Sequence, residues 1–176
     1  MRFLFCILPI FLFSCTSGEV EENPEFIWTQ ENSTNLSHNV ALQEEIDIKL
    51  FLELHKDWEM NRTGSGLQYF IYEHSEDVDT SIHPIPGDVA EIEYTITLLS
   101  GDECYRTEDD EYEEFVVDNS EIETGIQEGI KLLSPGDRAK LIVPSHLAHG
   151  MAGDLDKIPP LTTLVIDIYL MGIIRR

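Results

Sequence analysis

The sequence predicts an α+β fold: a twisted antiparallel β-sheet wrapped on one short α-helix, with an amphipathic helix before it. Five β-rich or alternating apolar segments support the sheet, and they lie at residues 67–72, 89–99, 115–117, 139–143 and 164–170. A single helical repeat interrupts them, with Ile122, Ile126, Ile130 and Leu133 at spacings of four, four and three. Several strands and one helix suit a sheet that is covered on one face.

Residues 1–14 are predicted to be a lipoprotein signal peptide. Arg2 supplies a positive start, and the run from Phe3 to Phe13 is almost wholly apolar but too short to span a bilayer. The run ends in Leu12-Phe13-Ser14-Cys15, which resembles the lipobox of bacterial lipoproteins. We therefore expect lipid on Cys15 and an outer-membrane lipoprotein of the cell envelope, facing the periplasm or the cell surface. A plain signal peptide is the alternative.

Residues 15–38 are predicted to be a flexible acidic tether, because the segment is rich in polar and acidic residues. Cys6 lies inside the signal peptide and Cys15 is expected to carry lipid, which leaves Cys104 alone in the mature chain. No intramolecular disulfide is therefore expected.

Residues 39–62 are predicted to form the N-terminal helix, capped by Ser37 or Asn39 and ended by the glycines of segment 63–66. Its apolar stripe recurs every four residues and consists of Leu42, Ile46, Leu50, Leu54 and Trp58. An exposed stripe of this kind must be buried against something. It either packs on the following domain or pairs two copies of the chain in a dimer.

Residues 63–176 are predicted to form the folded domain. Segment 67–72 is β-rich, and segment 89–99 alternates polar with apolar residues. Segments 139–143 and 164–170 are strongly apolar or alternating. The helix between these pairs is predicted to be capped by Asn119 or Ser120 and ended by the turn Ser134-Pro135-Gly136-Asp137.

Five motifs in this domain resemble, in order and spacing, those of the FKBP-type peptidyl-prolyl isomerases. They are Gly87-Asp88-Val89 with Tyr94-Thr95 and Gly101, then Glu121 to Ile130, Pro135 to Leu141, Val143 to Gly150, and Ile158-Pro159-Pro160 with Thr163 to Ile168. Together with the lipobox and the helix, they look most like lipoprotein members of that family, including those associated with gliding motility in Bacteroidota.

The resemblance implies isomerisation of X-Pro bonds, with proline-containing polypeptides as clients and the membrane reached through the lipid anchor alone. It implies no cofactor and no metal. Carried over by motif, the site residues are Tyr94, Cys104, Tyr105, Ile122, Glu123, Ile126, His149, Ile158 and Ile166. Ile126 stands where the family has the floor that receives the proline ring. The backbone N–H of Glu123 stands where the family binds the substrate carbonyl.

Three departures from the family pattern make this site more polar and less aromatic. His149 replaces the usual tyrosine, Cys104-Tyr105 replaces Phe-Asp, and Ile126 stands where tryptophan or leucine is common. The aromatic residue expected near position 113 is displaced to Tyr112 or Phe115. We therefore expect weakened isomerase activity. A non-catalytic chaperone or assembly module of a cell-envelope complex, with the same fold, is the alternative.

The charge balance limits the partners. The chain has 34 Asp and Glu against 11 Lys and Arg, a formal charge of −23, which argues against nucleic-acid binding. Twelve of the acidic residues fall between Asp102 and Glu128, where the family layout has one rim of the pocket. The resemblance thus suggests a negative rim that favours proline segments flanked by lysine or arginine.

Overall fold

The computed structural model of this chain describes residues 29–75 and 82–176. The predicted signal peptide at 1–14, the expected lipid on Cys15 and the predicted tether up to residue 28 therefore lie outside the described residues. Within the described ranges, no helix is both long enough and apolar enough to cross a bilayer.

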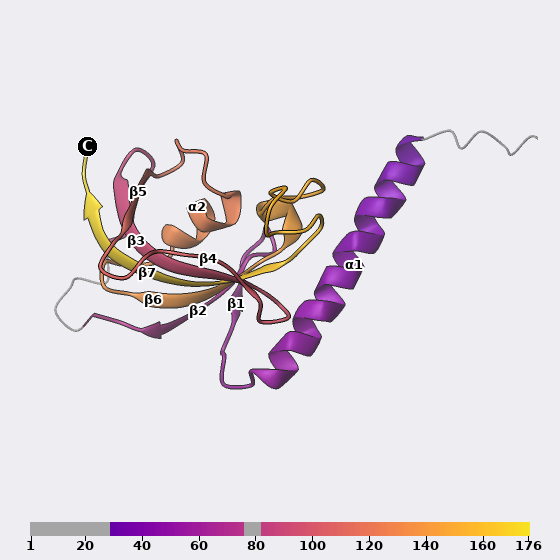
Figure 1. Cartoon of the computed structure of the whole chain (residues 1–176), viewed down its shortest axis with the longest axis horizontal. Coiled ribbons are helices and arrows are strands. Elements are labelled where there is room, and N and C mark those ends of the chain that lie inside the picture. Colours follow the sequence, from indigo (N-terminus) through magenta and orange to yellow (C-terminus); the bar gives the residue numbers. More distant parts are fainter. Residues whose placement is uncertain (1–28, 76–81) are drawn as a thin grey trace, which may run out of the picture.

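In the described part of the chain, seven strands form one antiparallel sheet, which confirms the predicted fold class (Figure 1). They are β1 (Asn61–Arg62), β2 (Gln68–Glu73), β3 (Val89–Leu98), β4 (Glu103–Arg106), β5 (Glu113–Val116), β6 (Arg138–Val143) and β7 (Leu164–Ile174). Their order is β1-β2-β6-β7-β3-β4, and β5 also pairs with β3. The register of β3 sets Ile96 opposite Ile166 on β7 and opposite Tyr105 on β4, which brings three chain segments to one place.

Helix α2 (Thr124–Ile130) lies across one face of this sheet and approaches it through two glycines (Figure 1). A Cβ atom on Gly125 would lie 2.3 Å from Val143 Cγ1, and one on Gly129 would lie 2.6 Å from Leu141 Cδ1. Glycines four residues apart share one helix face, so this face is the one that meets β6. The close approach buries Ile126 and Ile130 in the core.

Helix α2 is shorter than the predicted repeat, and its N-cap is Glu123 rather than Asn119 or Ser120. The reason is the buried side chain of Gln127, which holds the preceding segment. Its Nε2 donates to Ser120 Oγ over 2.6 Å, and its Oε1 accepts from the N–H of Asp118 over 2.8 Å. Ser120, one of the two predicted caps, therefore binds a glutamine side chain instead.

Helix α1 (Gln30–Leu54) begins nine residues before the predicted start at Asn39. Its N-cap is Thr29, whose Oγ1 accepts the N–H of Asn32 over 3.2 Å. Residues 30–38, which were predicted as tether, are therefore helical. The helix also ends earlier than predicted, and Trp58 lies beyond its end.

Four of the five residues of the predicted apolar stripe are exposed, so the expectation that they pack on the domain is wrong; the fifth, Trp58, is partly buried. The exposed fractions are 46% for Leu42, 52% for Ile46, 62% for Leu50 and 82% for Leu54. The buried residues of α1 are instead Glu44 and Ile48. They lie two positions along from Leu42 and Ile46, about 200° around the helix. A polar contact of Glu44, described below, sets this orientation, which a hydrophobic pattern does not reveal.

Candidate functional site

Four of the nine implied site residues form a buried apolar floor. The exposed fractions are 4% for Cys104, 2% for Ile126, 2% for Ile158 and 0% for Ile166, and all four belong to one core cluster. They come from β4, α2, the loop before β7 and β7 itself, so the fold gathers distant segments at this place. Tyr94, Tyr105 and Ile122 are partly exposed and pack against the same cluster.

Glu123 brings a backbone donor to this floor. It is the N-cap of α2, and its carbonyl accepts the N–H groups of Ile126 and Gln127 over 3.0 and 3.1 Å. Its own N–H makes no hydrogen bond to another described residue. The first N–H groups of a helix have no partner within the helix, so they are available to an incoming carbonyl oxygen.

His149 faces Glu123 from the loop that follows the short 3₁₀ helix η1 (Ser145–Leu147). Its Nε2 lies 2.9 Å from Glu123 Oε1, and both side chains are largely buried. This nitrogen makes no hydrogen bond within the described part of the chain. The contact becomes an ion pair when the imidazole is protonated. The structure therefore brings His149 and Glu123, two of the implied site residues, into contact at the edge of the site.

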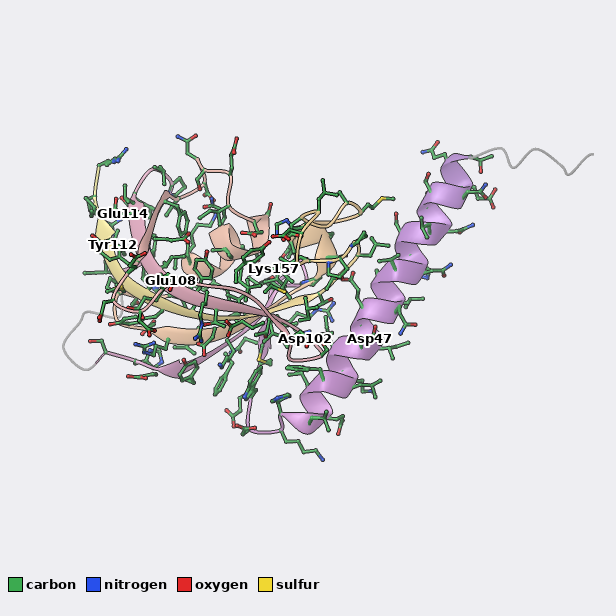
Figure 2. All side chains as sticks on the ribbon, viewed as in Figure 1. Asp47, Asp102, Glu108, Tyr112, Glu114 and Lys157 are labelled. Carbon is green, nitrogen blue, oxygen red and sulfur yellow. The ribbon has the colours of Figure 1, made fainter. Side chains whose placement is uncertain are left out.

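Tyr94 is held by a carboxylate from a neighbouring strand. Its hydroxyl donates to Glu113 Oε1 over 2.7 Å. Burial, followed by this hydrogen bond, raises the pKa of Tyr94 above its ordinary value, so the hydroxyl remains a donor at neutral pH. Of the two displaced aromatics, Phe115 is a core residue. Tyr112 is half exposed and lies with Glu114 on the β5 side of the domain, away from α1 (Figure 2).

Tyr105 fastens the flap, residues 154–158, to β4. The Tyr105 hydroxyl donates to Asp154, and this hydrogen bond is the main reason that the pKa of Tyr105 rises to about 12. Asp154 Oδ1 also accepts the N–H of Ile158 over 2.7 Å. Lys157 Nζ donates to the carbonyl oxygen of Cys104 over 2.7 Å and lies 4.7 Å from the centre of the Tyr105 ring.

The Cys104 side chain serves as part of the wall. Burial and the nearby charge of Asp154 raise the pKa of the Cys104 thiol, against the opposing effect of Lys157. A thiol with a raised pKa is a poor nucleophile. The chemistry at this site therefore rests on shape, apolarity and directed donors.

Three residues of this site were missed by sequence reasoning: Glu113, Asp154 and Lys157. Each is a charged residue in an acidic, loop-rich stretch, where the default expectation is a solvated surface. Tyr105 gave the one usable signal, because a partly buried phenol requires a hydrogen-bond partner.

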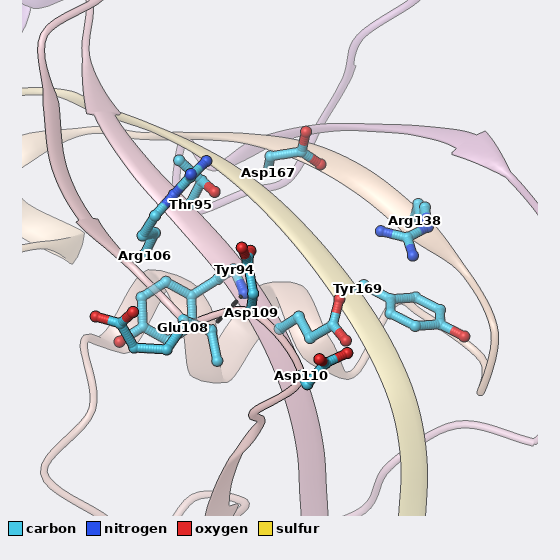
Figure 3. A pocket seen from close by; sticks show the side chains of 11 residues that line it. Tyr94, Thr95, Arg106, Glu108, Asp109, Asp110, Arg138, Asp167 and Tyr169 are labelled. Carbon is cyan, nitrogen blue, oxygen red and sulfur yellow. Dashed lines mark hydrogen bonds between the residues drawn. The ribbon is translucent and has the colours of Figure 1, made fainter.

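The acidic segment predicted as one rim is divided between two faces of the sheet. Glu113 and Glu123 contact site residues, whereas Glu108, Asp109 and Asp110 line a cavity of about 400 Å³ on the outer face (Figure 3). The rest of its lining comes mainly from neighbouring strands, and it includes Tyr94 of the site: Glu93, Tyr94, Thr95, Arg106, Thr107, Arg138, Asp167 and Tyr169. Apart from Tyr94, the lining residues of β3, β6 and β7 alternate with core residues, so the cavity opens mainly on the sheet face opposite α2.

Three comparisons place the chain among known proteins. The family model described as FKBP-type peptidyl-prolyl cis-trans isomerase matches residues 80–171. FK506-binding protein 1 of Debaryomyces hansenii is 36% identical over 97 residues, which cover 54% of this chain and 86% of that protein. The probable FKBP-type isomerase FkpA of Neisseria meningitidis is 33% identical over 111 residues, which cover 63% of this chain and 39% of that protein.

The same likeness extends to a solved structure. The crystal structure of FkpA from Escherichia coli superposes with a TM-score of 0.64 at 26% identity. The match covers 81% of this chain and 64% of that chain. This chain therefore spans most of the short relative but only about two fifths of the Neisseria protein.

Proposed function

This chain belongs to the FKBP-type peptidyl-prolyl cis-trans isomerase family, and we propose that it isomerises X-Pro bonds in exported or envelope proteins. The observation that carries the proposal is the place of Glu123. An unbonded backbone N–H at the start of α2 lies beside a floor that includes Ile126, Ile158 and Ile166. A prolyl ring on that floor would bring its carbonyl oxygen toward this donor.

Such a site needs little chemical machinery. Rotation about an X-Pro bond is slow because it breaks amide resonance, with a barrier of about 18–20 kcal/mol for a peptide bond. The planar amide is charge-separated, so an apolar, water-poor surface disfavours it relative to the twisted form. A surface that binds the twisted form better than either planar form lowers the barrier.

We expect this activity to be weaker than that of relatives with an aromatic pocket. His149, Cys104 and Ile126 replace larger or aromatic residues of the family pattern, and aromatic side chains contribute large apolar contact areas. The contact of His149 with Glu123 further supports a narrowed, more polar edge.

The test compares two variants that differ in the backbone N–H at position 123. Glu123 has a φ of −52°, which a proline ring can adopt, so Glu123→Pro deletes the N–H while keeping the backbone direction. Glu123→Ala is the matched control, because it removes the same side chain and keeps the N–H. We expect kcat/KM on proline peptides to fall up to about tenfold further in Glu123→Pro, since a hydrogen bond contributes about 0.5–1.5 kcal/mol. Equal rates in the two variants would contradict the assigned role.

The same isomerisation assay, together with an aggregation assay, tests the alternative of a non-catalytic protein. A wild-type chain that suppresses aggregation of unfolded proteins but leaves X-Pro isomerisation at its uncatalysed rate would be a non-catalytic chaperone or assembly module.

We also propose export and lipid anchoring at Cys15, on the strength of the Leu12-Phe13-Ser14-Cys15 motif. Several acyl chains on one residue would anchor the protein stably, whereas one chain binds only marginally. Mass spectrometry of the mature N-terminus tests this, with Cys15→Ser as the variant expected to lose both lipid and membrane fractionation. An unlipidated wild-type protein would contradict it.

We also propose that the site prefers clients whose prolines are flanked by lysine or arginine. Glu113 and Glu123 lie at the site, and Asp154 and Asp156 lie on the flap. Opposite charges steer encounter, and salt screens them. Basic-flanked peptides should therefore lose their advantage over acidic-flanked ones as ionic strength rises.

We propose that two copies of the chain pair through α1. The pairing would bury the exposed stripe of Leu42, Ile46, Leu50 and Leu54. Its four large apolar residues are each 46% exposed or more. Two such helices packed together would remove this surface from water. Light scattering of Leu50→Glu against Lys49→Glu tests the idea: the first should be monomeric and the second should resemble wild type. Monomeric wild-type protein at all concentrations would exclude it.

A further inference from the structure

One carboxylate of α1 contacts both ends of the loop that joins β6 to β7. Glu44 Oε1 accepts the backbone N–H of Ser145 over 2.7 Å and the hydroxyl of Thr163 over 2.9 Å. All three residues are buried, with exposed fractions of 9%, 2% and 4%. Ser145 follows β6 and Thr163 precedes β7, so the loop between them is closed at its base by a residue from a different part of the chain.

The contact continues into the loop. The carbonyl oxygen of Ser145 accepts the N–H of Ala148 over 3.0 Å and that of Gly150 over 2.8 Å. The carbonyl oxygen of Gly150 in turn accepts the N–H of Leu161 over 2.8 Å. His149 lies between the two residues that bind the Ser145 carbonyl, and its backbone is therefore fixed relative to Ser145, whose N–H Glu44 accepts.

The polar contact of Glu44 is one of several that dock α1; another is the exposed ion pair of Glu45 with Arg62 over 3.2 Å. Glu44 and Ile48 are the buried residues of this helix, and they lie one turn apart on one face. Figure 1 shows α1 running past the side of the domain where this loop emerges. A buried carboxylate is unfavourable unless hydrogen bonds compensate for the lost water, and charged acceptors form the stronger ones. An apolar residue at position 44 would dock the helix without holding the loop.

We propose that Glu44 is a positioning residue for the isomerase reaction, and this rests on the function proposed above. By closing the loop at Ser145 and Thr163, it sets His149 relative to the donor on Glu123. The N-terminal helix thereby acts on the site through this loop, and none of its residues belongs to the core cluster that forms the floor.

The test compares Glu44→Ala, Glu44→Gln and Ile48→Ala in the purified full-length chain. Glu44→Gln keeps an acceptor oxygen, whereas Glu44→Ala removes the hydrogen bonds to Ser145 and Thr163. Ile48→Ala weakens the docking of α1 and leaves these two hydrogen bonds in place. We expect kcat/KM on proline peptides to fall about tenfold in Glu44→Ala and within about threefold in the other two, since small displacements in a site are costly. Amide exchange at Ser145 and Gly150 should accelerate in Glu44→Ala only.

Two results would overturn the proposal. One is equal activity in Glu44→Ala and Ile48→Ala at the same folded fraction, which would make Glu44 a docking residue alone. The other is unchanged exchange at Gly150 in Glu44→Ala. If Glu44→Ala fails to fold, Thr163→Val removes one of the two bonds and should give a smaller loss in the same direction. Were the wild type inactive, the isomerase function would fail, while the exchange rates would still show whether Glu44 holds the loop.

Discussion

His149 Nε2 lies 2.9 Å from Glu123 Oε1, so the loop after η1 and the start of α2 meet side chain to side chain at the edge of the site. The Glu123 side chain is thus engaged by His149, while its backbone N–H makes no hydrogen bond to another described residue. A larger aromatic donor at position 149 would release Glu123 and add apolar wall.

His149→Tyr should therefore raise kcat/KM on neutral proline peptides by a few-fold, about 1 kcal/mol in the barrier. His38→Tyr, an exposed position on α1, is the matched control and should leave the rate unchanged. The protease-coupled peptide assay measures both. A lower rate in His149→Tyr would mean that the imidazole itself assists the reaction.

Restoring the family's aspartate at position 105 should fail, for a reason that is visible only in the structure. Tyr105 donates to Asp154, so Tyr105→Asp would set two carboxylates against each other and loosen the flap. Tyr105→Phe loses the hydrogen bond alone. We expect both the melting temperature and kcat/KM to fall further in Tyr105→Asp than in Tyr105→Phe; the reverse order would contradict the role of this contact.

Asp154 should give the fold a pH-dependent contribution in acid. Burial acts to raise its pKa, but the hydrogen bonds from Tyr105 and from flap N–H groups outweigh burial and hold the pKa of Asp154 well below its usual range. A group with a lowered folded pKa stabilises above its unfolded pKa of about 3.9, and this stabilisation is lost as pH falls below that value. The difference in unfolding free energy between wild type and Asp154→Asn should therefore shrink from about pH 5 to pH 3. A difference that does not vary with pH would contradict the hydrogen-bonded carboxylate.

The glycines of α2 should not tolerate a methyl group, although alanine favours helices by about 1 kcal/mol. Gly125→Ala meets Val143 and the carbonyl oxygen of Leu147, which would lie 3.2 Å from the new Cβ. We expect a loss of about 1–3 kcal/mol in unfolding free energy from overpacking. Gly64→Ala is the matched control, because no atom lies within 4 Å of a Cβ there. Urea denaturation measures both, and a stabilised Gly125→Ala would contradict the close packing of α2 on β6.

The fold could be predicted because its strands and its central helix carry clear periodicity. The longest strand, β7, and its partner β3 both read as alternating apolar segments, which tertiary packing then pairs. The short strands β1 and β4 were missed, because two to four residues carry no period. The face of α1 was wrong because a buried Glu44 decides the docking, and a carboxylate is read from sequence as exposed.

The candidate site also has a part that the sequence predicts and a part that it does not. The floor of Cys104, Ile126, Ile158 and Ile166 followed from the family motifs, and all four lie in one cluster. The contacts around it depend on side-chain reach across the fold: Glu113 to Tyr94, and Asp154 to Tyr105. Residues 19 and 49 positions apart form these pairs, and no single-sequence pattern links them.

We propose that this chain is an isomerase with a weakened pocket. The most direct measurement is the rate of cis–trans isomerisation of a proline peptide with the purified chain, beside the FK506-binding protein of Debaryomyces hansenii in the same assay. We expect a rate above the uncatalysed reaction and below that of the yeast protein. A rate equal to the uncatalysed reaction would contradict the activity, and a rate equal to the relative's would contradict the weakening.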